Sequence, residues 1–261
     1  MTRRSLTYSS YLALDDLLAA QHVTSGEHDE LLFIVIHQVY ELWFKQLLHE
    51  AARLQERLEA GDTAHALHTA RRILTILKTV VAQIDVLETM TPSQFLSFRD
   101  RLEAASGFQS AQFRELEATL GRRSPAMLSA YAEDSGERAR IGAAMTRPCV
   151  YDSLLRYLAS QGYPVPARAL ERDVSQPLEA DPAVQEAILA AYRDDGEASQ
   201  ICERMVDLDE GIMEWRYRHV QMVKRTIGMR TGTGGSAGAG YLAKTLLTPA
   251  FPDLWAVRTE L

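Results

Sequence analysis

Cysteine is scarce in this chain of 261 residues. Only Cys149 and Cys202 occur, and neither forms part of a CxxC or CxxCH pattern. The spacing excludes a cysteine zinc knuckle and the covalent attachment of a c-type haem. We expect two reduced thiols without a metal or redox role.

Long apolar runs and an excess of basic charge are also missing. The longest uninterrupted apolar stretch, 31–36, has six residues, whereas a bilayer crossing needs roughly 20. Arg3 and Arg4 have no apolar stretch behind them, so no signal peptide is expected. Lys and Arg number 28 against 35 Asp and Glu, a formal charge of -7, and a phosphate backbone needs a basic face. The sequence predicts a cytoplasmic protein with no nucleic-acid or membrane partner.

Hydrolytic and dinucleotide chemistry have no convincing motif. Neither a serine nucleophile elbow nor a His-Glu-x-x-His zinc motif occurs. Five glycines lie within 232–240, and part of this stretch fits a relaxed dinucleotide fingerprint, but it follows a helical pattern where that fingerprint requires a strand. Two interpretations remain: a flexible surface loop, or a loop whose backbone amides and Thr233 hydroxyl close over an anionic group.

Helical periodicity covers most of the chain. Apolar residues three and four positions apart predict long helices over 28–59, 62–88 and 199–227, the last ended by Gly228. Thr91 and Gln94 form a capping box for another helix. Shorter helices are expected at 108–120, 137–145, 150–160, from 181, at 241–247 and at 253–260. The glycines and prolines of 122–180 suggest a peripheral connection. We predict an all-α, single-domain helical bundle spanning 1–261.

Three predicted helices carry an aromatic residue one turn before a polar one, which places each pair on one helix face. The pairs are Phe33 and His37, Phe95 and Arg99, and Trp215 and His219. Such an arginine can bind a carboxylate with two parallel hydrogen bonds, and a helical histidine with aromatic neighbours can be an axial haem ligand. From spacing alone, core histidines and a solvated or ion-paired arginine are the more common explanations.

Seven blocks in this chain resemble the tryptophan 2,3-dioxygenase family. They are 6–12 (LTYSSYL), 28–37 (HDE with Phe33 and His37), 40–46 (YELWFKQ), 98–100 (FRD), 106–110 (SGFQS), 215–219 (WRYRH) and 232–236 (GTGGS). The blocks follow the family's order from residue 6 to the C-terminus. Only about 122–195 is loosely similar.

The resemblance implies an all-helical homotetramer with one haem b per subunit, ferrous in its active form. The family converts L-tryptophan and O2 to N-formyl-L-kynurenine. By the same resemblance His219 is the axial iron ligand and Trp215 contributes to the haem site, while Ser106 and Gly107 line the side where oxygen binds. His37 is the catalytic distal histidine, which accepts a hydrogen bond from the indole N–H.

The remaining site residues implied by the resemblance bind the substrate. Phe33 is a wall of the indole pocket, and Phe95 stands beside it where some relatives have tyrosine. Arg99 binds the carboxylate, and Thr233 contacts the ammonium and carboxylate ends. The segment 1–25 is expected to enter a neighbouring subunit's site, with these residues in contact: Tyr8, Tyr11 and Leu12.

Two other functions are compatible with the same residues. One is a haem monooxygenase or peroxygenase that acts on a substituted indole, and the other is a binding protein without turnover. Arg99 and Thr233 together favour an amino-acid substrate, because both suit the zwitterionic end of an amino acid. A dioxygenase of L-tryptophan is therefore the leading prediction.

Overall fold

Helices alone build the fold in residues 6–103, 105, 107–230 and 246–261, which are those that the computed structural model describes. No strand occurs in these ranges, as the periodicity predicts. The elements in chain order are α1 (Tyr8–Leu12), α2 (Leu14–Leu18), α3 (His28–Glu59), α4 (Thr63–Leu87), α5 (Pro92–Arg99), η1 (Asp100–Leu102), η2 (Gly107–Gln109), α6 (Ala111–Leu120), η3 (Pro125–Leu128), α7 (Gly136–Met145), α8 (Val150–Ser160), α9 (Ala167–Leu170), α10 (Pro182–Arg193), α11 (Glu197–Ile227), α13 (Pro252–Ala256) and η4 (Val257–Thr259).

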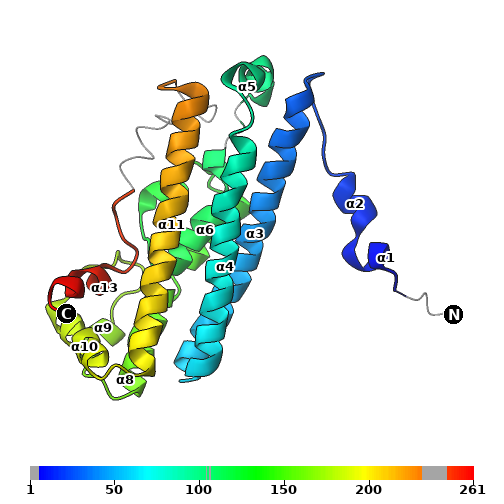
Figure 1. Ribbon diagram of the computed structural model, residues 1–261. Coiled ribbons are helices and arrows are strands. Elements are labelled where there is room, and N and C mark those ends of the chain that lie inside the picture. Colours follow the sequence, from blue (N-terminus) through cyan, green and yellow to red (C-terminus); the bar gives the residue numbers. More distant parts are fainter. Residues whose placement is uncertain (1–5, 104, 106, 231–245) are drawn as a thin grey trace.

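Three long helices, α3, α4 and α11, run side by side, and α4 packs against both of the others (Figure 1). Their shared faces bury Leu54 and Leu58 of α3 and Ala66 and Ala70 of α4 completely. Gly211 lies in the middle of α11, where the helix passes close to α4. A Cβ atom there would lie 3.2 Å from Cδ1 of Leu77, so any other residue would force the Leu77 side chain of α4 to shift by a few tenths of an ångström.

The prediction that 122–180 is a peripheral connection is wrong for α8. This helix packs against α3, and its apolar face is fully or almost fully buried: Val150, Tyr151, Leu154, Leu155, Tyr157 and Leu158. The hydroxyl of Tyr157 lies 2.8 Å from Thr63 Oγ1. The surrounding glycines and prolines interrupt the periodicity on both sides, and they hid a short core helix.

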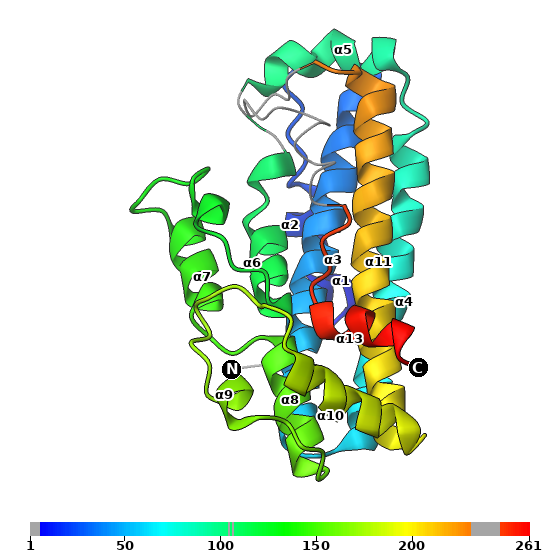
Figure 2. The ribbon, with the colours of Figure 1, turned by 90° about the vertical axis from the view of Figure 1, so that its left-hand side faces the viewer.

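The C-terminal segment is fastened to α11 by one buried carboxylate. Asp209 accepts hydrogen bonds from the backbone N–H groups of Ala250 and Phe251 and from Nε1 of Trp255. Phe251 is fully buried beside it. Figure 2 shows this segment running along α11 before α13 turns across it. The helix predicted at 253–260 is present as α13 and η4, whereas most of the one predicted at 241–247 lies outside the described residues.

The N-terminal helices α1 and α2 stand apart from the bundle (Figure 1) and bury no residue. The chain is held to the bundle only after α2. There the buried carboxylate of Glu30 accepts hydrogen bonds from the backbone N–H groups of Thr24 and Ser25, 2.8 and 2.7 Å away. Thr24 and Ser25 therefore attach the N-terminal segment to the start of α3. The helices α1 and α2 bury none of their residues against the bundle of their own chain.

One helix of the described chain, α3, is long and apolar enough to cross a membrane by length and composition alone. A core helix of a bundle passes the same test. Leu47, Leu54 and Leu58 of α3 are buried against the protein interior, and α4, α6 and α8 all pack on this helix. Because only 22% of its most apolar 18-residue window is buried, packing within this chain accounts for part of its apolar character.

Candidate functional site

His37 lies one turn after Phe33 on α3 and is a neutral hydrogen-bond acceptor toward the interior. Its Nδ1 is 2.7 Å from the carbonyl oxygen of Phe33, and because a carbonyl can only accept, Nδ1 carries the proton. Burial lowers the pKa of His37 below 6.5, against the opposing effects of the Phe33 carbonyl and the charge of Glu41. Nε2 therefore keeps its lone pair at neutral pH.

His219 lies on α11 and is also neutral. Burial lowers its pKa to about 4, and the charge of His37 lowers it further, so the two imidazoles are close enough to influence each other electrostatically. Each ring keeps some accessible surface although protein surrounds it. No hydrogen-bond partner of His219 occurs among the described residues. Its lone pair is available to a metal ion, which requires a neutral imidazole.

Aromatic rings surround His37 and connect α3 to α5. The ring of Phe33 lies 4.1 Å from that of His37, and Phe95 and Phe98 of α5 are each 5.7 Å from Phe33, centroid to centroid. Arg99 follows Phe95 by one helical turn, so the two side chains share a face of α5, and the Nε of Arg99 is buried. The structure thus brings the two predicted aromatic residues together and places the arginine beside them.

Gly107 begins η2 and lies against His37. A Cβ atom at this position would be 3.8 Å from His37 Nε2, so glycine leaves the space over the acceptor nitrogen open. The other two predicted residues of this region, Ser106 and Thr233, lie outside the described residues.

A second aromatic cluster supports His219 and was largely missed from the sequence. Trp215 stacks on His219, with centroids 5.2 Å apart and planes at 7°. Phe113 of α6 lies 4.6 Å from Trp215, and Tyr40 and Phe44 of α3 contact the same indole. Trp215 was expected from the sequence, but Phe113 was not, because its apolar spacing is that of any core helix.

Tyr8, Tyr11 and Leu12 are not brought to this site within one chain. Tyr8 and Tyr11 of α1 are 77% and 74% exposed. Figure 1 shows α1 standing away from the three long helices. These side chains therefore contribute nothing to the pocket of their own subunit.

The described residues fit a haem group by their donor chemistry. The indole Nε1 of Trp215 is buried and makes no hydrogen bond of ordinary geometry among the described residues, although it interacts with the Tyr40 hydroxyl, and burial without a well-placed partner is costly for such a group. A carboxylate of a haem propionate is an acceptor of the required kind. His219 would supply the neutral imidazole of an axial ligand, and Phe113 and Phe44 would supply apolar walls.

The described residues form a helical bundle with two neutral imidazoles, His37 and His219, whose chemistry suits the binding of a cofactor. Residues 1–140 and 191–261 match the family model described as tryptophan 2,3-dioxygenase. Curated relatives carry the same name. The protein from Anaeromyxobacter dehalogenans is 66% identical, covering 98% of this chain and 97% of the relative, and those from Herpetosiphon aurantiacus and Caulobacter vibrioides are 56% and 46% identical, each covering 99% of both chains. This chain belongs to the tryptophan 2,3-dioxygenase family.

Proposed function

We propose that this enzyme uses a haem b, active as Fe²⁺, to insert both atoms of O2 across the indole C2=C3 bond of L-tryptophan. The product is N-formyl-L-kynurenine, as expected for tryptophan catabolism by the kynurenine pathway. The observation that supports this most is the pair of neutral imidazoles, His37 and His219, which are close enough to influence each other electrostatically. Bound at His219, the haem supplies the activation of O2 for oxidation of the indole.

The protein's own residues orient the substrate. His37 Nε2 accepts a hydrogen bond from the indole N–H, since Nδ1 already donates to the Phe33 carbonyl. Phe33 and Phe95 hold the two faces or edges of the indole by aromatic contact. No strong base is needed at His37, because its lowered pKa suits an acceptor of a hydrogen bond rather than a group that holds a proton at neutral pH. Positioning of this kind supplies a large part of catalysis.

Arg99 binds the substrate carboxylate in this proposal, and Thr233 contacts the carboxylate and the ammonium group. The guanidinium geometry matches a carboxylate with two parallel hydrogen bonds. An indole without the amino-acid end would leave Arg99 without that ligand in a partly buried site, which makes the pair a specificity device as well as an anchor.

We also propose that the active protein is a cytoplasmic homotetramer in which α1 completes a neighbouring subunit's site. Tyr8, Tyr11 and Leu12 lie on a helix that buries none of its residues in its own chain. Exposed aromatic and leucine side chains at such a density mark a contact with another molecule. In the tetramer, Tyr8, Tyr11 and Leu12 of one subunit cover the pocket beside Phe33 and Phe95 of a neighbouring subunit.

Labelled oxygen tests the proposed reaction directly. Haem-loaded, reduced protein is given L-tryptophan under ¹⁸O2, and the product is analysed by mass spectrometry. Two labelled atoms in N-formylkynurenine are expected. One labelled atom in the product would indicate the monooxygenase alternative. Binding of L-tryptophan without consumption of oxygen or formation of any product would indicate a binding protein.

A further inference from the structure

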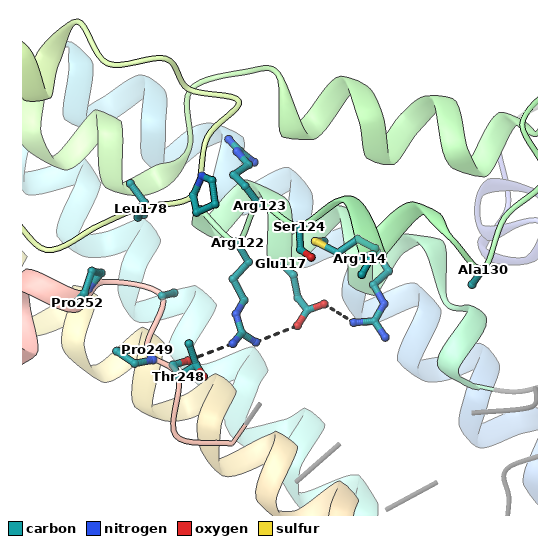
Figure 3. Close-up of a pocket in the computed structure, with 15 residues that line it drawn as sticks. Arg114, Glu117, Arg122, Arg123, Ser124, Ala130, Leu178, Thr248, Pro249 and Pro252 are labelled. Atoms are coloured by element: carbon teal, nitrogen blue, oxygen red, sulfur yellow. Dashed lines mark hydrogen bonds and ion pairs between the residues drawn. The ribbon is translucent and has the colours of Figure 1, made fainter. Parts of the chain in front are cut away.

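A second cavity lies away from the two imidazoles and is not used by the proposed reaction. It has a volume of about 380 Å³ and lies between α6, the 121–130 segment and the C-terminal segment (Figure 3). Cavities of this size hold small organic molecules. None of the residues placed in the imidazole site lines it.

The polar wall of this cavity carries more positive than negative charge. Glu117 is buried and forms ion pairs with three arginines: Arg114 at 2.6 Å, Arg122 at 3.3 Å and Arg216 at 2.5 Å. Burial raises the pKa of Glu117, but the charges of Arg216, Arg114 and Arg122 outweigh it and lower the pKa overall. Asp209 interacts with Arg216 at longer range. The residues that line the cavity therefore include three arginines, Arg114, Arg122 and Arg123, and one carboxylate, Glu117.

Arg123 adds a further buried cation to the same wall. Its guanidinium donates to the carbonyl groups of Val174, Ala118, Ala144 and Arg147. Among the described residues no carboxylate lies within ion-pair distance of it. Asp152 acts on Arg123 electrostatically without forming an ion pair with it, so the positive charge of Arg123 is not paired directly.

Arg122 is the cation with hydrogen-bonding capacity left for a ligand. It donates to Glu117 and to the carbonyl oxygen of Thr248, both at 3.3 Å, and these two bonds use two of its five N–H groups. Its side chain is only 18% exposed. Figure 3 shows the guanidinium between Glu117 and Thr248 at the edge of the cavity.

Many of the other lining residues are apolar or small. They include Gly121, Ala126, Met127, Pro177, Leu178 and Pro249. Gly121 has φ +113, and a Cβ atom there would lie 2.5 Å from Cδ1 of Leu178, so glycine is required at this part of the lining. Pro177 and Leu178 belong to 141–190, the part of the chain that the family model leaves unmatched.

We propose that this cavity binds a small monocarboxylic acid with an apolar or aromatic body. The carboxylate lies against Arg122 in the field of Arg114 and Arg123, and the body lies on Leu178 and the neighbouring prolines. An inorganic anion would leave the apolar lining unused, and a neutral ring would leave the charge excess unbalanced. The proposal is independent of the reaction at His37 and His219.

Calorimetric titration of the full-length, haem-loaded protein with phenylacetate tests the proposal. Because Arg99 also binds carboxylates, the titration is repeated with Arg99→Met, and one saturable site should remain there. In the Arg99→Met background, Arg122→Met should weaken that site by about tenfold or more, since a charged hydrogen bond is lost. Ala126→Phe should abolish it by filling the cavity while keeping every charge. Arg140→Met, which removes an exposed arginine of α7, is the matched control and should leave binding unchanged.

Other probes decide the ligand class. The neutral analogue 2-phenylethanol and inorganic phosphate should each bind much more weakly than phenylacetate. Three results would overturn the proposal: no saturable site in Arg99→Met, a site insensitive to both Arg122→Met and Ala126→Phe, or phosphate binding as tightly as phenylacetate. Circular dichroism and thermal unfolding establish that each variant is folded, and Ala126→Phe keeps the test decisive if Arg122→Met does not fold.

Discussion

Trp215 and His219 stack with their ring planes 7° apart, one turn apart on α11. The stacking fixes the imidazole orientation, and within the described parts of the chain the buried Nε1 of Trp215 makes no hydrogen bond of ordinary geometry. Trp215→Phe keeps an aromatic ring but removes this donor, and we expect haem affinity to fall about tenfold, the value of one hydrogen bond to a charged group. Haem transfer to apomyoglobin measures the change. Trp43→Phe, which removes another buried and unpartnered indole N–H, is the control, and an equal loss in both variants would contradict a propionate contact at Trp215.

Substrate selectivity depends on Arg99 in this account. Arg99→Met should lower kcat/KM for L-tryptophan by about 10–100-fold, because a charged hydrogen-bonding partner of the carboxylate is lost. Reactivity toward tryptamine, which has no carboxylate, should change little. Steady-state kinetics with both substrates provide the comparison. Arg101→Met, at an exposed position two residues further on, should behave like the unmodified enzyme, and equal losses for the two substrates in Arg99→Met would rule out a carboxylate contact.

The pH dependence follows from the state of His37. Burial lowers its pKa below 6.5, so the ring is neutral above that pH and gains a proton only as the pH falls through the lowered value. A protonated Nε2 cannot accept a hydrogen bond from the indole N–H. The KM for L-tryptophan should therefore be level from pH 8 to 6.5 and rise only in more acidic solution.

Two variants test whether His37 causes the rise of KM in acidic solution. His37→Ala should raise KM at every pH and remove the acidic rise. His65→Ala, which changes a largely exposed histidine of α4, should leave the profile as it was. A KM that rises already between pH 8 and 7 in the unmodified enzyme would show that His37 is not the neutral acceptor described here.

The role of α1 predicts complementation between two inactive proteins. A chain without residues 1–20 should lack activity because no Tyr8, Tyr11 or Leu12 reaches any site, and Arg99→Met should be severely impaired for the reason above. Co-assembled, the two chains contain sites that combine Arg99 of the truncated chain with α1 of the other. Activity should then recover to a substantial fraction of normal, measured on the co-purified mixture. Full activity of the truncated chain alone would show that α1 completes no site.

The long helices could be predicted because each carries an uninterrupted apolar face. The pattern over 28–59 gave α3 with the observed ends, and those over 62–88 and 199–227 gave α4 and α11 within two residues. The capping box at Thr91 is present as expected, with Gln94 donating and accepting in turn. Local periodicity and capping are encoded within a few residues, so they can be predicted without the tertiary structure.

Long-range relations could not be predicted from spacing. Glu117 looks like a surface residue of α6, and only the approach of α11 shows that Arg216 meets it in the interior. Likewise nothing near Asp209 indicates that it binds Ala250, 41 residues later. The pairing of His37 with His219 came from the family resemblance, since the spacing of each histidine alone favoured a core residue.

Haem binding by variants of the two histidines tests the central claim most directly. Purified His219→Gly should lose the Soret band and bind haem more than about 100-fold less tightly, a larger loss than mutation of a residue that only supports a metal ligand causes. Added imidazole should restore the band. His37→Ala should keep its haem, because Nε2 of His37 accepts a hydrogen bond from the substrate. If His219→Gly retained haem while His37→Ala lost it, the assignment of the two imidazoles would be contradicted.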